Sequence, residues 1–399
     1  MTTRAFSLAL IATALFLVGC VAAFNWVVDP YWYFRAFDIV GFNHVRRHAE
    51  ANERLVKPAL VSRLRPQAVI LGNSVAEIGL PPSNAGFTQN GALTSYNLAL
   101  PGGTWNEIYC LALYVMRSTD VRRIVIGVSS VHHEAGDETC PSDSAFRRPD
   151  YAKLLFSRSA FAASRETLRD QNQPPTMTAD GNWYFHRFID DPRIHDGATW
   201  ALARVIRRDL CRNMRFREDA LDWSLVRMSP VPKDVGAGLR TLIRTAREKR
   251  IELVLLYYPK HVVLNEVQRA CQGHESHWNE LWAMVSIAEQ EGDPQLTQVW
   301  DFETYVPTNA ERLDGRSPGP DLLWQEAQHF NQAVGAAAMD AIYRGKPGYG
   351  DRVTVGNFRE LVERREVERV RFLETNPWVR EEFETFAGRV ATVAVKPTR

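Results

Sequence analysis

The chain has 399 residues, enough for one large domain with insertions or for two domains. Its 45% hydrophobic and 24% charged residues are typical of an ordinary globular protein. The formal net charge is only +1, and acidic residues are interspersed among the arginines. This balance argues against a nucleic-acid partner, which usually requires a basic stripe.

The first 28 residues predict a membrane anchor. Residues 6–28 carry no charge, and a run of roughly 23 residues is long enough to cross a bilayer. Arg4 and the free amine precede this run, as in a signal anchor whose N-terminus stays in the cytoplasm. Aromatic residues follow where an interfacial belt belongs, at Trp26, Tyr31, Trp32 and Tyr33. We therefore expect a single-pass protein.

Two alternatives stay open for this segment. Residues 17–20 resemble a bacterial lipobox, which would give a cleaved chain with lipid on Cys20. A cleaved secretory signal ranks third, because no small-x-small site precedes a polar start. All three interpretations place most of the chain outside the cytoplasm, where disulfides form. The four remaining cysteines allow two disulfides in three pairings: Cys110, Cys140, Cys211 and Cys271.

Strand and helix patterns alternate along the rest of the chain. Apolar runs bounded by turns predict five strands, at 67–71, 95–100, 123–128, 251–258 and 298–302. Apolar spacing and capping residues predict helices near 49–56, 75–78, 104–116, 235–249, 275–291 and 330–343. Strands joined by helical crossovers predict an α/β fold with a doubly wound, mainly parallel five-stranded sheet.

The expected organisation is an anchor at 1–28, an α/β domain at 29–344 and a charged helical extension at 345–399. We expect the irregular stretch at about 133–232 to be a helical insertion over one edge of the sheet. The extension is expected to pack outside the sheet or on a partner. Helices are predicted within these two segments at 151–169, 197–215, 357–372 and 378–386.

Candidate site residues follow from the sheet itself, since ligands bind beyond the carboxyl ends of its strands. The residues at those ends are Asn73 and Ser74, Gly102 and Gly103, Ser129 to His133, Lys260 and His261, and Asp301. Ser74 is the candidate nucleophile, because a serine on a tight strand-to-helix turn exposes its hydroxyl beside backbone N–H groups. The alternative is an ordinary turn capped by Asn73 or Ser74.

A serine nucleophile needs a base, and the base needs an acid that orients it. Glu326 and His329 are three residues apart, so a helix or turn places them on the same side. The carboxylate would hold one ring nitrogen of His329 while the other faces Ser74. The alternative is a surface Glu–His pair at the start of a helix.

Three short blocks in this order resemble the SGNH (GDSL-like) hydrolase superfamily: Gly72-Asn73-Ser74, Asn97-x-Ala99-x-x-Gly102 and Glu326-x-x-His329. The resemblance is closest to membrane-anchored bacterial SGNH-like proteins of the polysaccharide O-acetylation type, through Asp29-Pro30-Tyr31 and Trp324. It implies that Ser74 is the nucleophile, His329 the base, Glu326 the orienting acid and Gly102 an oxyanion donor. The further candidates for oxyanion or substrate binding are Asn97, Asn73, Ser129 and His261.

The chain departs from the family pattern after the third strand. No Gly-x-Asn-Asp block is present there, and removal of one side-chain oxyanion donor typically lowers the rate about 100- to 1,000-fold. Ser129, Ser130 and His132 are the possible substitutes. Two smaller departures, Asn73 and Glu326 in place of aspartates, leave the nucleophile and the orienting carboxylate intact.

Two functions are therefore expected. The first is a serine acyltransferase or esterase of the bacterial inner membrane, with its globular part in the periplasm or otherwise outside the cytoplasm. The resemblance and the localisation imply that it acts on acyl esters, chiefly acetyl esters, of cell-envelope polysaccharide. The expected partners are that polysaccharide or another acyl ester, the membrane, and a membrane acyl-transfer protein. The second is a degenerate domain that binds glycan or scaffolds an envelope assembly. No cofactor is implied. A metal is not expected, because His132-His133 and His274-x-x-His277 have no third ligand nearby in sequence.

Overall fold

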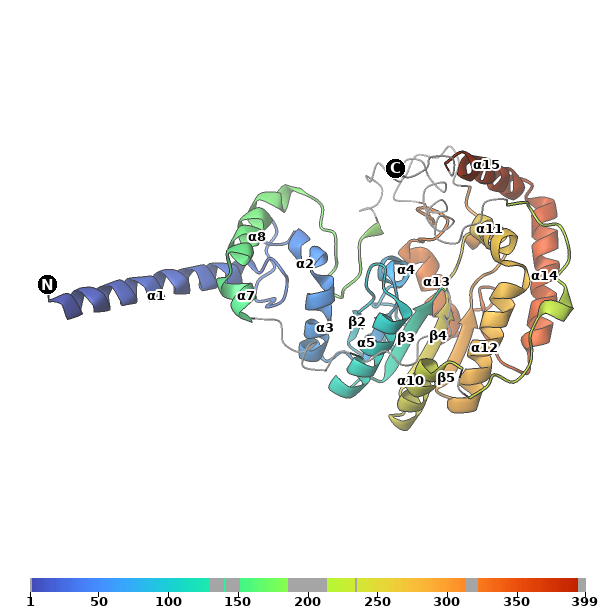
Figure 1. Ribbon diagram of the computed structural model, residues 1–399, viewed down its shortest axis with the longest axis horizontal. Coiled ribbons are helices and arrows are strands. Elements are labelled where there is room, and N and C mark those ends of the chain that lie inside the picture. Colours follow the sequence, from blue (N-terminus) through green and yellow to red (C-terminus); the bar gives the residue numbers. More distant parts are fainter. Residues whose placement is uncertain are drawn as a thin grey trace. The chain divides into compact units, whose positions relative to one another are not determined.

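The computed structural model describes residues 2–129, 140, 151–185, 214–233, 235–312 and 322–393. The chain divides into two compact units, shown with the whole chain in Figure 1. We call Met1–Arg65 with Cys140–Tyr184 the anchor unit, and Pro66–Thr139 with Phe185–Arg399 the sheet unit. This division differs from the expected one. Residues 29–65 and 151–184 belong with the anchor, and the C-terminal extension belongs with the sheet.

The anchor unit is helical. Its helices are α1 (Thr3–Val28), α2 (Arg47–Ala51), α3 (Glu53–Leu64), α7 (Tyr151–Phe156) and α8 (Arg158–Arg169), followed by the short helix η1 (Asp170–Asn172). By length and composition α1 is able to cross a membrane, as the uncharged sequence predicts. The predicted helical stretch at 151–169 is confirmed as α7 and α8.

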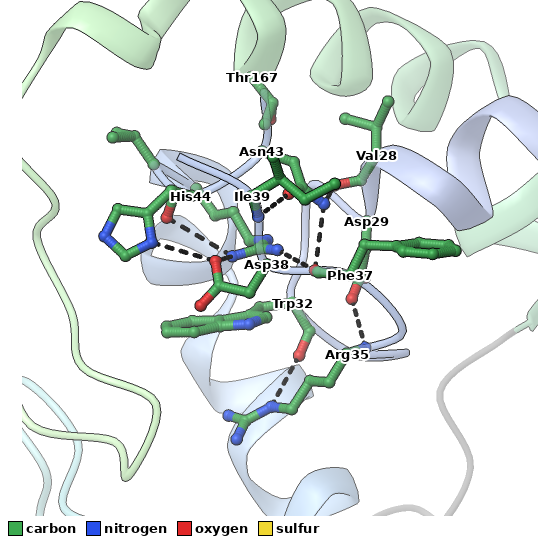
Figure 2. Close-up of polar contacts among 12 residues, drawn as sticks. Val28, Asp29, Trp32, Arg35, Phe37, Asp38, Ile39, Asn43, His44 and Thr167 are labelled. Carbon is green, nitrogen blue, oxygen red and sulfur yellow. Dashed lines mark hydrogen bonds and ion pairs between the residues drawn. The ribbon is translucent and has the colours of Figure 1, made fainter. Parts of the chain in front are cut away.

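The segment after α1 folds into a compact cluster of polar contacts, which Figure 2 shows in close-up. The Asp29 carboxylate accepts the Tyr33 and Arg35 backbone N–H groups at 2.9 and 2.7 Å. The Trp32 ring contacts the guanidinium groups of Arg35 and Arg46, at 5.0 and 4.9 Å from its centroid. Because Trp32 and Tyr33 are buried in this cluster, they do not form the interfacial belt expected from their position.

The sheet unit contains one six-stranded sheet. Its strands are β1 (Ala68–Leu71), β2 (Ser95–Asn97), β3 (Arg123–Val128), β4 (Glu252–Tyr257), β5 (Thr297–Asp301) and β6 (Asp351–Val353). The spatial order is β2-β1-β3-β4-β5-β6, and every neighbouring pair is parallel except β5 and β6. The five predicted strands are confirmed. The antiparallel edge strand β6 was not predicted, because its three residues contain no apolar run.

Helices cover both faces of this sheet (Figure 1). They are α4 (Ser74–Gly79), α5 (Trp105–Ser118), α10 (Ala237–Glu248), α11 (Val262–Gln272), α12 (Glu275–Glu291), α13 (Gln332–Arg344), α14 (Phe358–Thr375) and α15 (Trp378–Val393), with short helices η3 (Trp223–Leu225) and η4 (Pro307–Asn309). Ile70, Val125 and Val254 are register neighbours on adjacent strands. They share one core with residues of α4, α11, α13 and α15, while α10 packs with α5 and α12.

The C-terminal extension is part of this core. Val379, Phe383 and Phe386 of α15 are buried in the same hydrophobic cluster as the sheet. Arg369 of α14 forms a buried ion pair with Glu266 of α11, with nitrogen and oxygen 2.6 Å apart. The predicted helices at 357–372 and 378–386 are confirmed as α14 and α15, and α15 packs on α11 in the core of the sheet unit. The charges that suggested exposure are partly paired in the interior.

The cysteines agree in part with an oxidising compartment. Cys110, Cys140 and Cys271 are disulfide-bonded, and Cys20 is free and exposed on α1. Cys211 and most of the helix predicted at 197–215 lie outside the described residues, so the pairing remains a prediction.

Candidate active site

Ser74 lies at the start of α4, directly after the turn that follows β1. Asn73 is the N-cap of this helix, and its Oδ1 accepts the Val75 N–H at 3.0 Å. The cap therefore occupies the Asn73 side-chain oxygen and leaves the Ser74 hydroxyl available. Ser74 Oγ lies 2.8 Å from Nε2 of His329, a residue 255 positions later in the chain.

Glu326 and His329 lie on a tight loop between two bridged residues, Trp324 and Phe330. The Gln325 N–H donates to the His329 carbonyl at 3.0 Å and closes the loop. The Glu326 carboxylate bonds to Nδ1 of His329 and also accepts the backbone N–H groups of Gln328 and His329, at 2.7 and 3.0 Å. These bonds assign the Nδ1–H tautomer to His329, so Nε2 faces Ser74 as a proton acceptor.

Buried aromatic rings hold this loop in place. Trp324 is fully buried and its Nε1–H donates to the Thr308 carbonyl at 2.7 Å. Phe330 is fully buried too, and the two rings meet edge to face with centroids 5.6 Å apart. Fixed side chains at both ends of a short loop restrict the positions that Glu326 and His329 can occupy.

His261 contacts the loop that carries Glu326 and His329. It is fully buried, and its ring donates from Nε2 to the Glu311 carbonyl at 2.6 Å while Nδ1 accepts the Val263 N–H at 3.4 Å. The backbone N–H of His261 donates to the carbonyl of Ala327 at 3.2 Å, and the His261 ring contacts the ring of Trp324. From the sequence, a substrate-binding role and a structural role for His261 are equally open. In the structure it is a positioning residue, since both ring nitrogens already have protein partners.

Acid is expected to destabilise the fold through His261. Burial lowers the pKa of this imidazole to about 4, so the unfolded chain binds a proton more readily than the folded chain does. The free energy of unfolding should therefore fall as the pH decreases from about 6.5 to about 4, by up to about 3 kcal/mol from this group. Thermal unfolding of the wild type and His261→Gln across this range measures the difference. Equal pH slopes in the two proteins would contradict the assignment.

The β2 end of the site is a glycine-containing loop beside the Ser74 turn. The Leu100 N–H donates to the Gly72 carbonyl at 3.1 Å, and a Cβ on Gly103 would lie 3.1 Å from that same oxygen. Gly102 has a φ of +62° and is exposed, and among the described residues none accepts its N–H. A free N–H on a loop packed against the nucleophile turn is suited to an oxyanion.

Asn97 does not face the site. It is fully buried, its Nδ2 donates to the carbonyls of Ala76 and Leu80 at 2.9 and 3.2 Å, and its Oδ1 accepts the Ala99 N–H at 3.0 Å. The expectation that Asn97 binds substrate is therefore replaced by a positioning role. Its amide fixes α4, and hence Ser74, to the end of β2.

Tyr258, for which the sequence leaves open a place in a carbohydrate groove or in the core, contacts the Ser74 turn. It follows β4, is buried, and its hydroxyl accepts the Asn73 N–H at 3.3 Å. Its ring fills the space over two glycines, because a Cβ on Gly72 or Gly127 would lie 2.3 or 2.2 Å from Tyr258 atoms. Gly72 and Gly127 stand near the ends of the adjacent strands β1 and β3. Their missing side chains are the sequence feature that leaves room for a large side chain after β4.

A pocket of about 330 Å³ opens next to these residues. Val75, Ser129 and Gln328 line it, and each is adjacent in sequence to Ser74, to the end of β3 or to His329. Asn265 also lines the pocket; it is 5% exposed, and both polar atoms of its amide are buried without a hydrogen-bond partner among the described residues. Residues 130–139, including Ser130 and His132, lie outside the described part of the chain.

The far wall of the pocket carries paired charges. His277 lies between Asp301 and Glu303, with each ring nitrogen 3.4 Å from a carboxylate oxygen, and Lys260 bonds to Glu303. Burial by itself lowers the pKa of His277, but the charges of Glu303 and Asp301 outweigh it and raise the pKa. Among the described residues no three or more potential ligands gather as a metal site.

Comparisons with protein-family models, curated proteins and solved structures find no match to this chain.

Proposed function

We propose that the protein is a serine acyltransferase or esterase that uses Ser74, His329 and Glu326. The observation that carries the proposal is the continuous chain from the Glu326 carboxylate through His329 to the Ser74 hydroxyl, with Oγ and Nε2 2.8 Å apart. A carboxylate, an imidazole and a serine in this order are the parts that nucleophilic acyl transfer requires. The sequence resemblance to SGNH hydrolases supports the same chemistry independently of the geometry.

The proposed reaction has two steps. His329 Nε2 takes the Ser74 proton as Oγ attacks the ester carbonyl, and the leaving alcohol departs with that proton, which leaves an acyl-serine. In the second step His329 deprotonates water or a sugar hydroxyl, which attacks the acyl-serine and regenerates Ser74. Glu326 holds the imidazole in the required tautomer and stabilises its positive charge.

The oxyanion would be stabilised by few donors. Gly102 offers its N–H, and Ser129 stands where the SGNH pattern has a side-chain donor. The substrate that we favour is an acetyl ester of a cell-envelope polysaccharide, which rests on the resemblance and on α1. We place the non-reacting part of that substrate in the pocket that Val75, Ser129 and Gln328 line.

The proposal is tested with a fluorophosphonate probe, which reacts with activated serines. We expect the full-length wild type and the exposed-serine control Ser83→Ala to be labelled, and Ser74→Ala and His329→Ala to remain unlabelled. If the wild type is not labelled and hydrolyses no acetyl ester, the chain is not a serine acyl-transfer enzyme. A glycan-binding or scaffolding domain would then be the better hypothesis.

A further inference from the structure

Large apolar side chains remain exposed around the C-terminal end of α1. The Trp26 ring meets the Phe37 ring edge to face, with centroids 5.6 Å apart, and Phe24 contacts Phe161 of α8 at 5.4 Å. Trp26, Phe37 and Phe161 are all exposed. Three separate segments of the anchor unit therefore bring aromatic rings to the same level of the helix.

The loop at 36–42 adds aliphatic residues to this group. Asn43 fixes the loop to the end of α1, because its Nδ2 donates to the carbonyls of Val27, Val28 and Phe37 at 3.1 to 3.2 Å (Figure 2). Its Oδ1 accepts the Ile39 N–H at 2.9 Å. At the tip, Ile39 is 50% exposed and Val40 82% exposed. These hydrogen bonds fix the loop in a conformation that exposes its apolar tip, so the exposure does not result from fraying.

Helices α7 and α8, which pack against α1, carry further exposed aromatic residues. Phe156, at the end of α7, is 52% exposed, and Phe161 lies on α8 between Arg158 and Arg165, at three- and four-residue spacing. Both arginines are exposed. Aromatic residues flanked by basic ones on one helix face are typical of helices that lie in a membrane interface.

We propose that these residues form a lipid-binding surface that seats the anchor unit in the bilayer that α1 crosses. We name it the collar surface: Trp26, Phe37, Ile39, Val40, Phe156 and Phe161. The lipid bilayer is the expected binding partner because the collar surface is continuous with α1. The 26 residues of α1 span about 39 Å, whereas the hydrocarbon core of a bilayer is about 30 Å thick. The excess length places residues near Trp26 in the headgroup region, where exposed aromatic side chains are favoured.

The packing of α1 supports its retention in the mature protein. Asn25 is fully buried, donates to the Leu155 carbonyl and accepts the Ser164 hydroxyl, both at 2.8 Å. Cleavage after α1 would remove both of these hydrogen bonds from the folded anchor unit. The collar surface is thus part of a folded unit that includes the end of the membrane helix. It is independent of the chemistry proposed for Ser74.

The test places an environment-sensitive fluorophore on the collar surface. Val40→Cys is labelled with the fluorophore NBD in the full-length chain carrying Cys20→Ala, and the protein is reconstituted into phosphatidylethanolamine–phosphatidylglycerol vesicles. The matched control is Val367→Cys on α14, which is 59% exposed in the sheet unit. Both positions are exposed valines, so labelling should disturb neither fold.

We expect the emission of the label at position 40 to shift to shorter wavelength and to be quenched when brominated lipids are included. The label at position 367 should keep the emission of a water-exposed dye and should not be quenched. Water-like, unquenched emission at position 40 would overturn the proposal. Failure of the protein to float with the vesicles would overturn it as well, because α1 would then not span the bilayer.

Discussion

Replacement of Ser74 by alanine is expected to lower kcat for acyl-ester turnover by about 10⁴- to 10⁶-fold. The hydroxyl oxygen lies 2.8 Å from His329 Nε2 and is able to form the covalent intermediate. Alanine removes that oxygen and leaves the capped turn intact, because the Asn73 side chain caps α4 and not Ser74. The loss should therefore fall on kcat and not on folding.

Steady-state kinetics with an aryl acetate measures this loss, and the thermal unfolding midpoint checks the fold. The matched control is Ser83→Ala, an exposed serine after α4, which should keep wild-type kinetics. A Ser74→Ala protein that retains more than about a tenth of the wild-type kcat would exclude Ser74 as the nucleophile.

The second large effect is expected at Glu326. Replacement by glutamine keeps the size of the side chain but removes the negative charge that holds the Nδ1–H of His329. The imidazole is then free to take the tautomer with its proton on Nε2, which is unable to accept the Ser74 proton. We expect kcat to fall about 10⁴-fold, by analogy with the loss of the orienting carboxylate in other serine hydrolases.

The measurement is kcat as a function of pH for the wild type, Glu326→Gln and an exposed control, Glu360→Gln. If the carboxylate acts through the tautomer of His329, the activity of Glu326→Gln should recover in part at alkaline pH, where hydroxide replaces the general base. A control-like rate in Glu326→Gln at neutral pH would contradict the role of Glu326.

The local sequence was sufficient to predict the elements that hold the candidate site. Five strands were predicted because each is a short apolar run that ends at a turn, and a parallel sheet brings such ends to one edge. The sequence also paired Glu326 with His329, because only a tight local conformation is needed to bring residues three apart together. The structure adds the contact between His329 and Ser74, which depends on the tertiary fold.

The roles of other residues could not be assigned, because a short sequence motif does not show whether a side chain is buried. Asn97 and His261 are polar residues at strand ends, yet both are fully buried and bonded to backbone groups. Trp32 follows an apolar helix, but two arginines draw its ring into the anchor unit. Tyr258 is an aromatic residue after a strand, and its contact with the Ser74 turn depends on the glycines of two neighbouring strands that its ring covers. In each case a distant partner decided the environment.

Mass spectrometry detects the covalent acyl-enzyme that we propose Ser74 to form. The full-length protein is mixed with an aryl acetate, quenched in acid within the first turnover and digested. We predict a mass increase of one acetyl group on the peptide that contains Ser74 in the wild type, and none in Ser74→Ala. Ester turnover without any acylation of that peptide, or with the acetyl group on another residue that turns over, would contradict the claim.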